Sequence, residues 1–510
     1  MQLAADLYRC WVARLRSSQT LADGPRPPPE RWLQQIWRHQ RLLRQSLRLT
    51  DGRAVRVLHP GFWNRESGPD FRGGIVQFDT ESPVRGDIEV DVSEAGWEAH
   101  RHDRNPAFRQ VCLHVVWESG REDGGSPTLP LHPYLDAPLA DLVPWLDSNA
   151  GSEFPDLTAG KCSSPLAHLP AQTVSELWQQ AARIRFEQKA GCFEGRARQC
   201  GWEQALWEGL FAALGYKHNS WPFRRMAEVL QPRLTSTAKL RLNERAAGGN
   251  RAEVILVWQA RLLGIAGLLP HEVPRGPFGQ RVRSLWDYWW REHDEFAQDI
   301  LPAFAWRWSG VRPLNYPHRR LALAAHWIAS GNLADRLEKT LLSAQPGSSA
   351  ARRFLEELRP SDDPFWSRHW TCLSPRFRHP QPLLGQPRST DLAVNVVLPW
   401  LWARSQHGAE PAIRNHIAAL HSEWPAGEDN AVLKLARERL LGPNPRSRPR
   451  TAAEQQGLLQ IVRDFCDRSD AICAECRFPE LVSQELPEVP ALPSQSEQRS
   501  AADFRPGLGS

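Results

Sequence analysis

The chain has 510 residues, of which 41 % are hydrophobic and 24 % are charged, with a formal net charge of +5 and a pI near 8.8. This length can bury two or three hydrophobic cores, and the composition is that of a globular protein. No apolar run approaches the roughly 18 residues of a membrane span, and the N-terminal segment lacks the pattern of a secretory signal. We therefore expect no membrane span and a cytoplasmic protein. The mild positive charge permits a polyanionic partner without requiring one.

Arginine supplies most of the positive charge. Of the 63 basic residues only a few are lysines, and the first lysine in the chain is Lys161. Arginine side chains suit bidentate contact with phosphate, although a bias in codon usage would produce the same excess. Most of the 23 tryptophans, such as Trp286, Trp289 and Trp290, stand at helical spacings and are expected in cores, while a few could stack on bases.

The front of the chain predicts a mixed α+β domain. Residues 1–24 are expected to form a short helix and a linker, and a proline-rich stretch then ends at Glu30. Within a domain at 25–150, the ERWLQQIWRHQRLL segment has the apolar spacing of a helix, and Asp51-Gly52 is a hairpin turn. Strands are expected at residues 74–78, 86–92 and 111–117, with a fifth element in the segment SPTLPLHPYL. The fold class is therefore α+β, with a helix ahead of a mixed sheet.

The back of the chain predicts helices. Past residue 170 the apolar residues recur with a period near 3.6, but no repeat of fixed length is present. We expect an irregular all-helical domain at 151–484 that ends in a cysteine cluster. The tail at 485–510 is rich in proline, serine and charge and is expected to be disordered.

Acids and histidines gather on the strand-like segments of the front domain. Asp70 stands just before one strand, Glu89 and Asp91 alternate along the next, and His100 and His102 follow within a dozen residues. These are ligand types for a divalent cation, so the pattern predicts a metal site in a nuclease-like core. His114 alternates with apolar neighbours and is expected to be a hydrogen-bonded histidine within the sheet.

Several longer motifs resemble an uncharacterised bacterial family of unknown function. They are GPDF at 68–71, GDIEV at 86–90, WxxHxH at 97–102, LHVVW at 113–117, ALGYKHN at 213–219, RPLNYPHRRL at 312–321 and the terminal CxxC. The resemblance spans nearly the whole chain. Relatives tend to have Glu-x-His where this chain has Glu89-Val90-Asp91, which leaves the role of Asp91 open.

The front domain is also similar to the core of the PD-(D/E)XK nucleases, a restriction-endonuclease-like fold. The resemblance implies that Asp70 and Glu89 bind Mg²⁺ or Mn²⁺, with Asp91 as a further catalytic candidate. The lysine of that motif is absent, so proton transfer would pass to His100 or His102, because histidine titrates near neutral pH.

The expected function is hydrolysis of DNA or RNA phosphodiester bonds. Arg85, Arg101 and Arg104 are the candidates for holding the phosphate. There are two alternative interpretations. In the first, the nuclease-like fold is catalytically silent and binds nucleic acid or a protein. In the second, the chain is a structural protein in which the acids and histidines form a buried hydrogen-bonded network. The sequence leaves the oligomeric state open.

The nine cysteines include a second candidate metal site. Cys466, Cys473 and Cys476 have spacings that suit a zinc ion or, by analogy with some nucleases of the same superfamily, an iron–sulfur cluster. A fourth ligand would come from Cys10, Cys162 or Cys372. Buried thiols and a redox pair remain alternatives.

The polar segments at 213–219 and 312–321 admit two interpretations. Their arginines and helix ends could bind a phosphate backbone, or the segments could lock helical hairpins in place.

Overall fold

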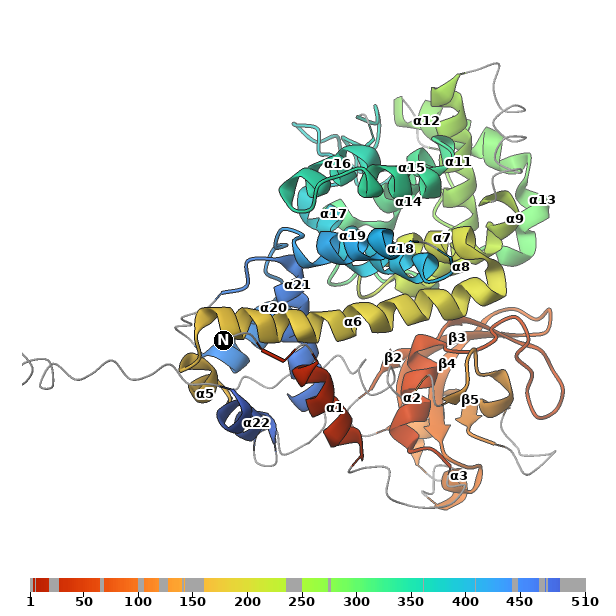
Figure 1. Ribbon diagram of the computed structural model, residues 1–510. Helices are drawn as coiled ribbons and strands as arrows, with labels where there is room; N and C mark the ends of the chain where they lie inside the picture. The colour runs from red at the N-terminus through yellow and green to blue at the C-terminus, as the bar shows by residue number, and fades with distance from the viewer. Residues whose placement is uncertain are drawn as a thin grey trace, which may run out of the picture.

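The computed structural model describes residues 3–4, 6–17, 27–64, 68–99, 105–118, 127–139, 142, 160–234, 250–273, 277–360, 362–408, 410–442, 448–466, 473 and 476–486. The disorder predicted for the tail concerns residues that lie almost entirely outside this part of the chain. The mixed α+β class is confirmed: a curled sheet is followed by a region built of helices (Figure 1).

The front of the chain contains two helices and the sheet. Its elements are α1 (Leu7–Ser17), α2 (Glu30–His39), β1 (Val55–His59), β2 (Phe62–Trp63), β3 (Phe71–Phe78), β4 (Val84–Asp91), α3 (Ala95–Ala99), η1 (Pro106–Phe108), β5 (Val111–Val116), β6 (Thr128–Pro130) and η2 (His132–Tyr134). Each strand predicted from the sequence corresponds to one of these elements. The predicted turn at Asp51-Gly52 also forms, and Gly52 has the positive φ of 88° that such a turn favours.

Helix α2 forms because its apolar residues fall on one side. Leu33, Ile36 and Trp37 recur at helical spacing and are fully buried. The helix ends at Gln40, whose left-handed backbone (φ 49°) lets its N–H bond back to the Trp37 carbonyl at 3.0 Å. The buried face lies against the sheet, in one hydrophobic cluster with residues of β3, β4 and β5.

The sheet combines an antiparallel meander with a parallel extension. Its order is β1-β3-β4-β5-β6, with β2 paired to β3; β1, β3 and β4 are antiparallel, while β5 and β6 run parallel to the strands before them. A bulge separates the pairs of Phe71 and Gly74 with β4, and Gly73 within it has φ +66°.

The two faces of the sheet have different partners. Ile88 and Val90 pack in the cluster of α2, so the alternate residues Glu89 and Asp91 of β4 lie on the opposite face. On that opposite face Ile75 and Leu58 join the large core of the helical region. The polar end of β4 is therefore positioned by a sheet that is packed on both sides.

The rest of the chain is helical. The elements are α5 (Ser163–Ala167), α6 (Ala171–Cys200), α7 (Trp202–Leu214), α8 (Ser220–Val229), α9 (Gln231–Leu234), α11 (Arg251–Ile265), α12 (Pro277–Trp290), α13 (His293–Phe296), η3 (Ala297–Asp299), η4 (Ala303–Ala305), η5 (Pro313–Asn315), α14 (Pro317–Ala329), α15 (Leu333–Leu342), α16 (Ser348–Leu358), α17 (Gln386–Leu392), η6 (Ala393–Val397), α18 (Leu398–Ser405), α19 (Pro411–Ser422), α20 (Ala431–Leu441), α21 (Ala452–Ile461), η7 (Val462–Cys466) and α22 (Phe478–Glu485).

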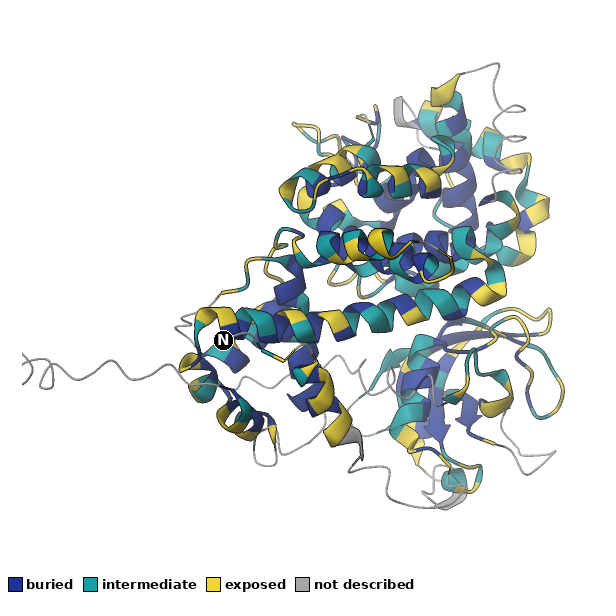
Figure 2. Ribbon diagram, in the orientation of Figure 1, coloured by how far each residue is buried: buried dark blue, intermediate teal, exposed yellow. Residues whose placement is uncertain are grey.

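Burial follows the inner faces of these helices, as the dark blue stripes in Figure 2 show. The long helix α6 runs between the sheet and the helices around α14–α16 in the view of Figure 1. No helix within the described residues, α6 included, combines the length and apolar character needed to cross a membrane.

Buried polar contacts join the front of the chain to the helices. Arg44 forms ion pairs with Glu208 at 3.0 Å and with Glu228, and all three side chains are at most 12 % exposed. Tyr8 of α1 donates its hydroxyl proton to Asp464 of η7 at 2.8 Å, which joins α1 to a late helix of the chain.

The second half of the RPLNYPHRRL segment, from Pro317 onward, is buried. Arg319 and Arg320 are 1 % and 6 % exposed. Arg319 Nη2 donates to the carbonyls of Gln381 and Pro382 at 3.1 and 3.0 Å, and Arg320 Nη1 donates to the Leu383 carbonyl at 2.6 Å. These contacts favour the interpretation in which the segment locks helices, because such guanidinium groups have little surface to offer a phosphate.

Candidate functional site

Two carboxylates meet where β3 begins beside the second half of β4. Phe71 pairs with Ile88 across the antiparallel strands, which brings Asp70 next to Glu89. The Asp70 N–H donates to Glu89 Oε2 at 3.1 Å, and the Val90 N–H donates to Asp70 Oδ2 at 3.1 Å. Each carboxylate thus accepts a main-chain hydrogen bond from the segment that carries the other, and these bonds orient both side chains.

Helix α2 adds polar groups to this pair. Gln34 Nε2 donates to Asp70 Oδ1 at 2.9 Å and to Glu30 Oε1 at 3.0 Å. Glu30 and Gln34 stand four residues apart and so share one side of the helix. Neither residue was predicted from the sequence, because the apolar spacing of α2 identifies only its buried face. An acid and an amide at helical spacing, just before a predicted sheet, are the signal that could have identified them.

The three carboxylates differ in exposure: Glu89 is buried, with 7 % of its surface exposed, Asp70 is partly buried and Glu30 is exposed. Burial, reinforced by the nearby Glu30 carboxylate, raises the pKa of Asp70 to about 7. Burial, reinforced by Asp70, raises the pKa of Glu89 to about 8. The hydrogen bonds to the two carboxylates therefore do not offset the energetic cost of burying their negative charge. The pair retains a proton near neutral pH, and a bound cation would displace that proton.

Asp91 has a different partner. Its Oδ2 lies 3.0 Å from Nε2 of His114, and both side chains are 4 % exposed. The parallel pairing of β4 with β5 sets His114 opposite Glu89. The prediction that His114 is hydrogen-bonded within the sheet is confirmed. Asp91 is thereby held in a buried pair two residues beyond Glu89.

His100, Arg101, His102 and Arg104 lie outside the described residues.

Arg85 is described, and it lies on β4 four residues before Glu89, a separation of about 13 Å along a strand. Its charge acts instead on His59: after burial, Arg85 and Arg307 are the groups that lower the pKa of His59 to about 4. The structure does not bring Arg85 to the carboxylates.

Arg72 is a cation that the sequence analysis did not single out. It is exposed and follows Asp70 by two residues. A Cβ atom added at Gly68 would lie 3.3 Å from Arg72 Nη2, so the guanidinium borders the loop that leads to Asp70. Its spacing from the Pro-Asp pair is the only sequence signal that could have identified it.

The donor set determines which ions could bind. Among the described residues, no group of three or more histidine, cysteine, aspartate and glutamate side chains is arranged as it stands to hold a metal ion. Asp70 and Glu89 nevertheless fit a Mg²⁺ or Mn²⁺ ion chemically, because such ions bind one or two carboxylates and take the rest of their oxygen ligands from carbonyls, water and substrate.

The three terminal cysteines lie at the far end of the helical region. Cys466 is buried at the end of η7, and Cys473 and Cys476 are partly buried just before α22. Of the three earlier cysteines proposed as a fourth ligand, Cys162 shares a hydrophobic cluster with Cys466, whereas Cys372 belongs to a different cluster and Cys10 is exposed.

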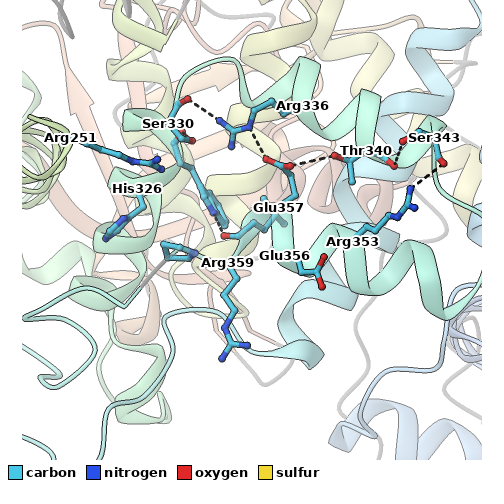
Figure 3. Close-up of a pocket in the computed structure, with 13 residues that line it drawn as sticks. Arg251, His326, Ser330, Arg336, Thr340, Ser343, Arg353, Glu356, Glu357 and Arg359 are labelled. Carbon is cyan, nitrogen blue, oxygen red and sulfur yellow. Dashed lines mark hydrogen bonds and ion pairs between the residues drawn. The ribbon is translucent and has the colours of Figure 1, made fainter. Parts of the chain in front are cut away.

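A cavity of about 720 Å³ opens among α11, α14, α15 and α16 (Figure 3). Its lining includes Arg251, Arg336, Arg353, Arg359, Glu356 and Glu357. Arg336 is held in place within the fold, because it donates to Glu357 at 2.7 Å and to the carbonyls of Ser330 and Gly331 at 2.9 and 2.7 Å. The other three arginines are exposed, and four arginines against two glutamates give the lining an excess of positive charge.

Comparison with known proteins gives a family and no activity. A family model described as a protein of unknown function, DUF2851, matches residues 30–430. No curated protein matches the chain. No solved structure matches it either.

Proposed function

The chain belongs to the DUF2851 family, and because the description of that family assigns no activity, we propose from the site itself that the protein is a metal-dependent nuclease. It would hydrolyse phosphodiester bonds of DNA or RNA at Asp70 and Glu89. The observation that carries the proposal is the reciprocal main-chain hydrogen bonding of the partly buried Asp70 and the buried Glu89, at 3.1 Å in both directions.

The order of the surrounding elements supports the proposal. Helix α2 precedes three antiparallel strands, β1, β3 and β4, and β5 then runs parallel to β4. The helix, the strand after Asp70 and the strand with Glu89 follow one another in the order of the PD-(D/E)XK core that the sequence resembles. The fold assignment itself is part of the proposal.

Each residue of the site has a role in the proposed reaction. A Mg²⁺ or Mn²⁺ ion held by Asp70 and Glu89 would supply positive charge beside the scissile phosphate and lower the pKa of the attacking water. Gln34 orients the Asp70 carboxylate, and Arg72, which borders the loop before Asp70, would hold the phosphate. His100 or His102 accepts the proton that the motif's lysine would otherwise handle.

A cleavage assay on the purified full chain tests this function. Labelled single- and double-stranded DNA and RNA are incubated with Mg²⁺, with Mn²⁺ and with a chelator. We expect metal-dependent cleavage that Asp70→Asn abolishes. Asp87→Asn is the matched control, because Asp87 lies on β4 with Glu89 and, like Asp70, accepts a main-chain hydrogen bond, from the Gly73 N–H at 3.0 Å. Absence of cleavage by the wild type, or equal cleavage by Asp70→Asn, contradicts the proposal.

The second candidate is a nuclease-like fold that binds nucleic acid without cutting it. Two observations favour it: the position of the missing lysine is held by Asp91, which pairs with His114, and the arginine-lined cavity of Figure 3 has an excess of positive charge. Binding of labelled nucleic acid that weakens steeply with salt, combined with no cleavage in either metal, would support this candidate over the first.

A further inference from the structure

The start and the end of the helical region pack together, and each carries cysteines. Cys162 directly precedes α5, Cys466 ends η7, and Cys473 and Cys476 precede α22. Cys162 and Cys466 are 5 % and 8 % exposed and belong to one hydrophobic cluster, against which Cys476 packs. Helix α5 also packs directly on α20 and α22. The fold thus gathers thiols from separate segments of the chain into one largely buried place.

The pKa directions of these thiols are consistent with this packing. Burial is the main cause that raises the pKa of Cys162, and the thiols of Cys466, Cys476 and Cys473 each raise it further. Cys473 has the same effect on the pKa of Cys476. These directions agree with the packing, which places Cys162 and Cys466 in one hydrophobic cluster with Cys476 against it.

A buried cation stands beside the thiols. Arg439 of α20 is 2 % exposed, and its Nη2 lies 3.8 Å from the sulfur of Cys473. Its carbonyl accepts the Gly160 N–H at 2.8 Å, and a Cβ at Gly160 would lie 3.4 Å from the sulfur of Cys162. Arg439 therefore connects the segment of Cys162 to that of Cys473, and its charge can offset the negative charge of thiolates.

We propose that Cys162, Cys466, Cys473 and Cys476 form a tetrathiolate site for a thiophilic metal centre, either a zinc ion or an iron–sulfur cluster. Four cysteines are a complete ligand set for both. Within the described residues no three of these side chains are arranged as they stand to hold an ion. Loading therefore draws the sulfurs together and releases the four thiol protons to solvent.

This centre is independent of the proposed nuclease activity. It joins the start of the helical region to its end, next to the contact between Tyr8 and Asp464 that secures α1. Its role is structural, because a shell of four protein ligands leaves no open position for a substrate.

Metal analysis of the full chain tests the proposal. The protein is purified without oxygen and without chelators, and its zinc, iron and acid-labile sulfide are measured together with its visible absorption. We expect about one zinc per chain with no visible band, or about four irons with sulfide and a visible band. A protein with neither metal, whose thiols all react freely once it is unfolded without a chelator, overturns the proposal.

Single substitutions distinguish this centre from metal bound elsewhere. Cys162→Ser should lose most of the bound metal, while Cys10→Ser, which changes an exposed cysteine on α1, should keep it. If Cys162→Ser does not fold, alkylation of the folded wild type decides: the four cysteines should resist the reagent until a chelator removes the metal. Wild-type metal content in a folded Cys162→Ser protein, or alkylation that is insensitive to the chelator, contradicts the assignment.

Discussion

The carboxylate pair in the sheet and the cysteine cluster among the helices both bury acidic groups, but the chain builds them differently. Asp70 and Glu89 are 19 residues apart, and main-chain hydrogen bonds between adjacent strands orient them. Cys162 meets Cys466 through the packing of helices from opposite ends of the helical region. One cluster offers oxygen and the other sulfur, so they select different metals. The comparison predicts two sites that can be loaded, emptied and mutated separately.

The largest expected effect is the loss of catalysis on Glu89→Gln. This change keeps the size of the side chain and removes its negative charge, so the pair loses half of its charge for a cation. We expect cleavage to fall by about 10⁴-fold or to the limit of detection. Single-turnover cleavage at saturating Mn²⁺ measures it, and circular dichroism checks that the protein remains folded. A rate within tenfold of the wild type would place the catalytic acids elsewhere.

His100→Ala should slow cleavage by roughly 10²–10⁴-fold, the usual cost of losing a general acid or base. His102→Ala is its natural comparison, because both histidines stand in the same motif. For the histidine that acts as the general base, the alanine variant should also lose the fall in rate at low pH that protonation of this histidine causes. If both variants cleave as fast as the wild type, neither histidine replaces the missing lysine.

Melting temperatures measured with and without Mn²⁺ test whether the two sites are independent. Mn²⁺ at about 100 times its dissociation constant should stabilise the folded protein by about 2.7 kcal/mol. We expect Asp70→Asn to lose this increase in melting temperature and Cys162→Ser to keep it, even though Cys162→Ser starts from a lower melting temperature. Loss of the Mn²⁺ effect in a folded Cys162→Ser protein would mean that the clusters are coupled.

The smallest expected effect concerns pH. Asp70 has a pKa of about 7 in the folded protein against an ordinary 3.8, and Glu89 about 8 against 4.5. Between about pH 4 and pH 8 the folded state therefore holds more protons than the unfolded chain, and the free energy of unfolding falls as the pH rises through this window.

Glu89→Gln should reduce that dependence. We expect the metal-free variant to be more stable than the wild type at pH 8 by roughly 1–2 kcal/mol, and the two to converge near pH 4. Urea denaturation at both pH values measures the difference. Equal stability at pH 8 would show that burial of the Glu89 carboxylate carries no cost.

The sequence predicted the front of the molecule well because the relevant signals are local. Alternating apolar and polar residues located β3, β4 and β5. Asp70 stands just before β3 and Glu89 lies on β4, so the antiparallel pairing of these two strands makes them neighbours. Glu30 and Gln34 were missed because the polar side of an amphipathic helix looks like any solvated surface. Only the packing of α2 on the sheet turns that side toward Asp70.

The helical region was less predictable for the opposite reason. Its periodicity identified helices, but spacing alone could not choose among Cys10, Cys162 and Cys372 as the partner of the terminal cysteines, because that choice depends on contacts between remote helices. Arg319 and Arg320 show the same limit: in the sequence they form a basic loop, and in the fold they are buried against carbonyl groups.

The most direct test of the central claim, that Asp70 and Glu89 form one cation site, is calorimetric titration of the metal-free protein with Mn²⁺ at pH 7 in two buffers of different ionisation enthalpy. Because both carboxyl groups have raised pKa values, binding should release protons, and the apparent enthalpy should differ between the buffers. The account predicts binding with proton release in the wild type and in Asp87→Asn, and no binding in Asp70→Asn. Unchanged Mn²⁺ affinity in a folded Asp70→Asn protein, or no binding by the wild type, would contradict it.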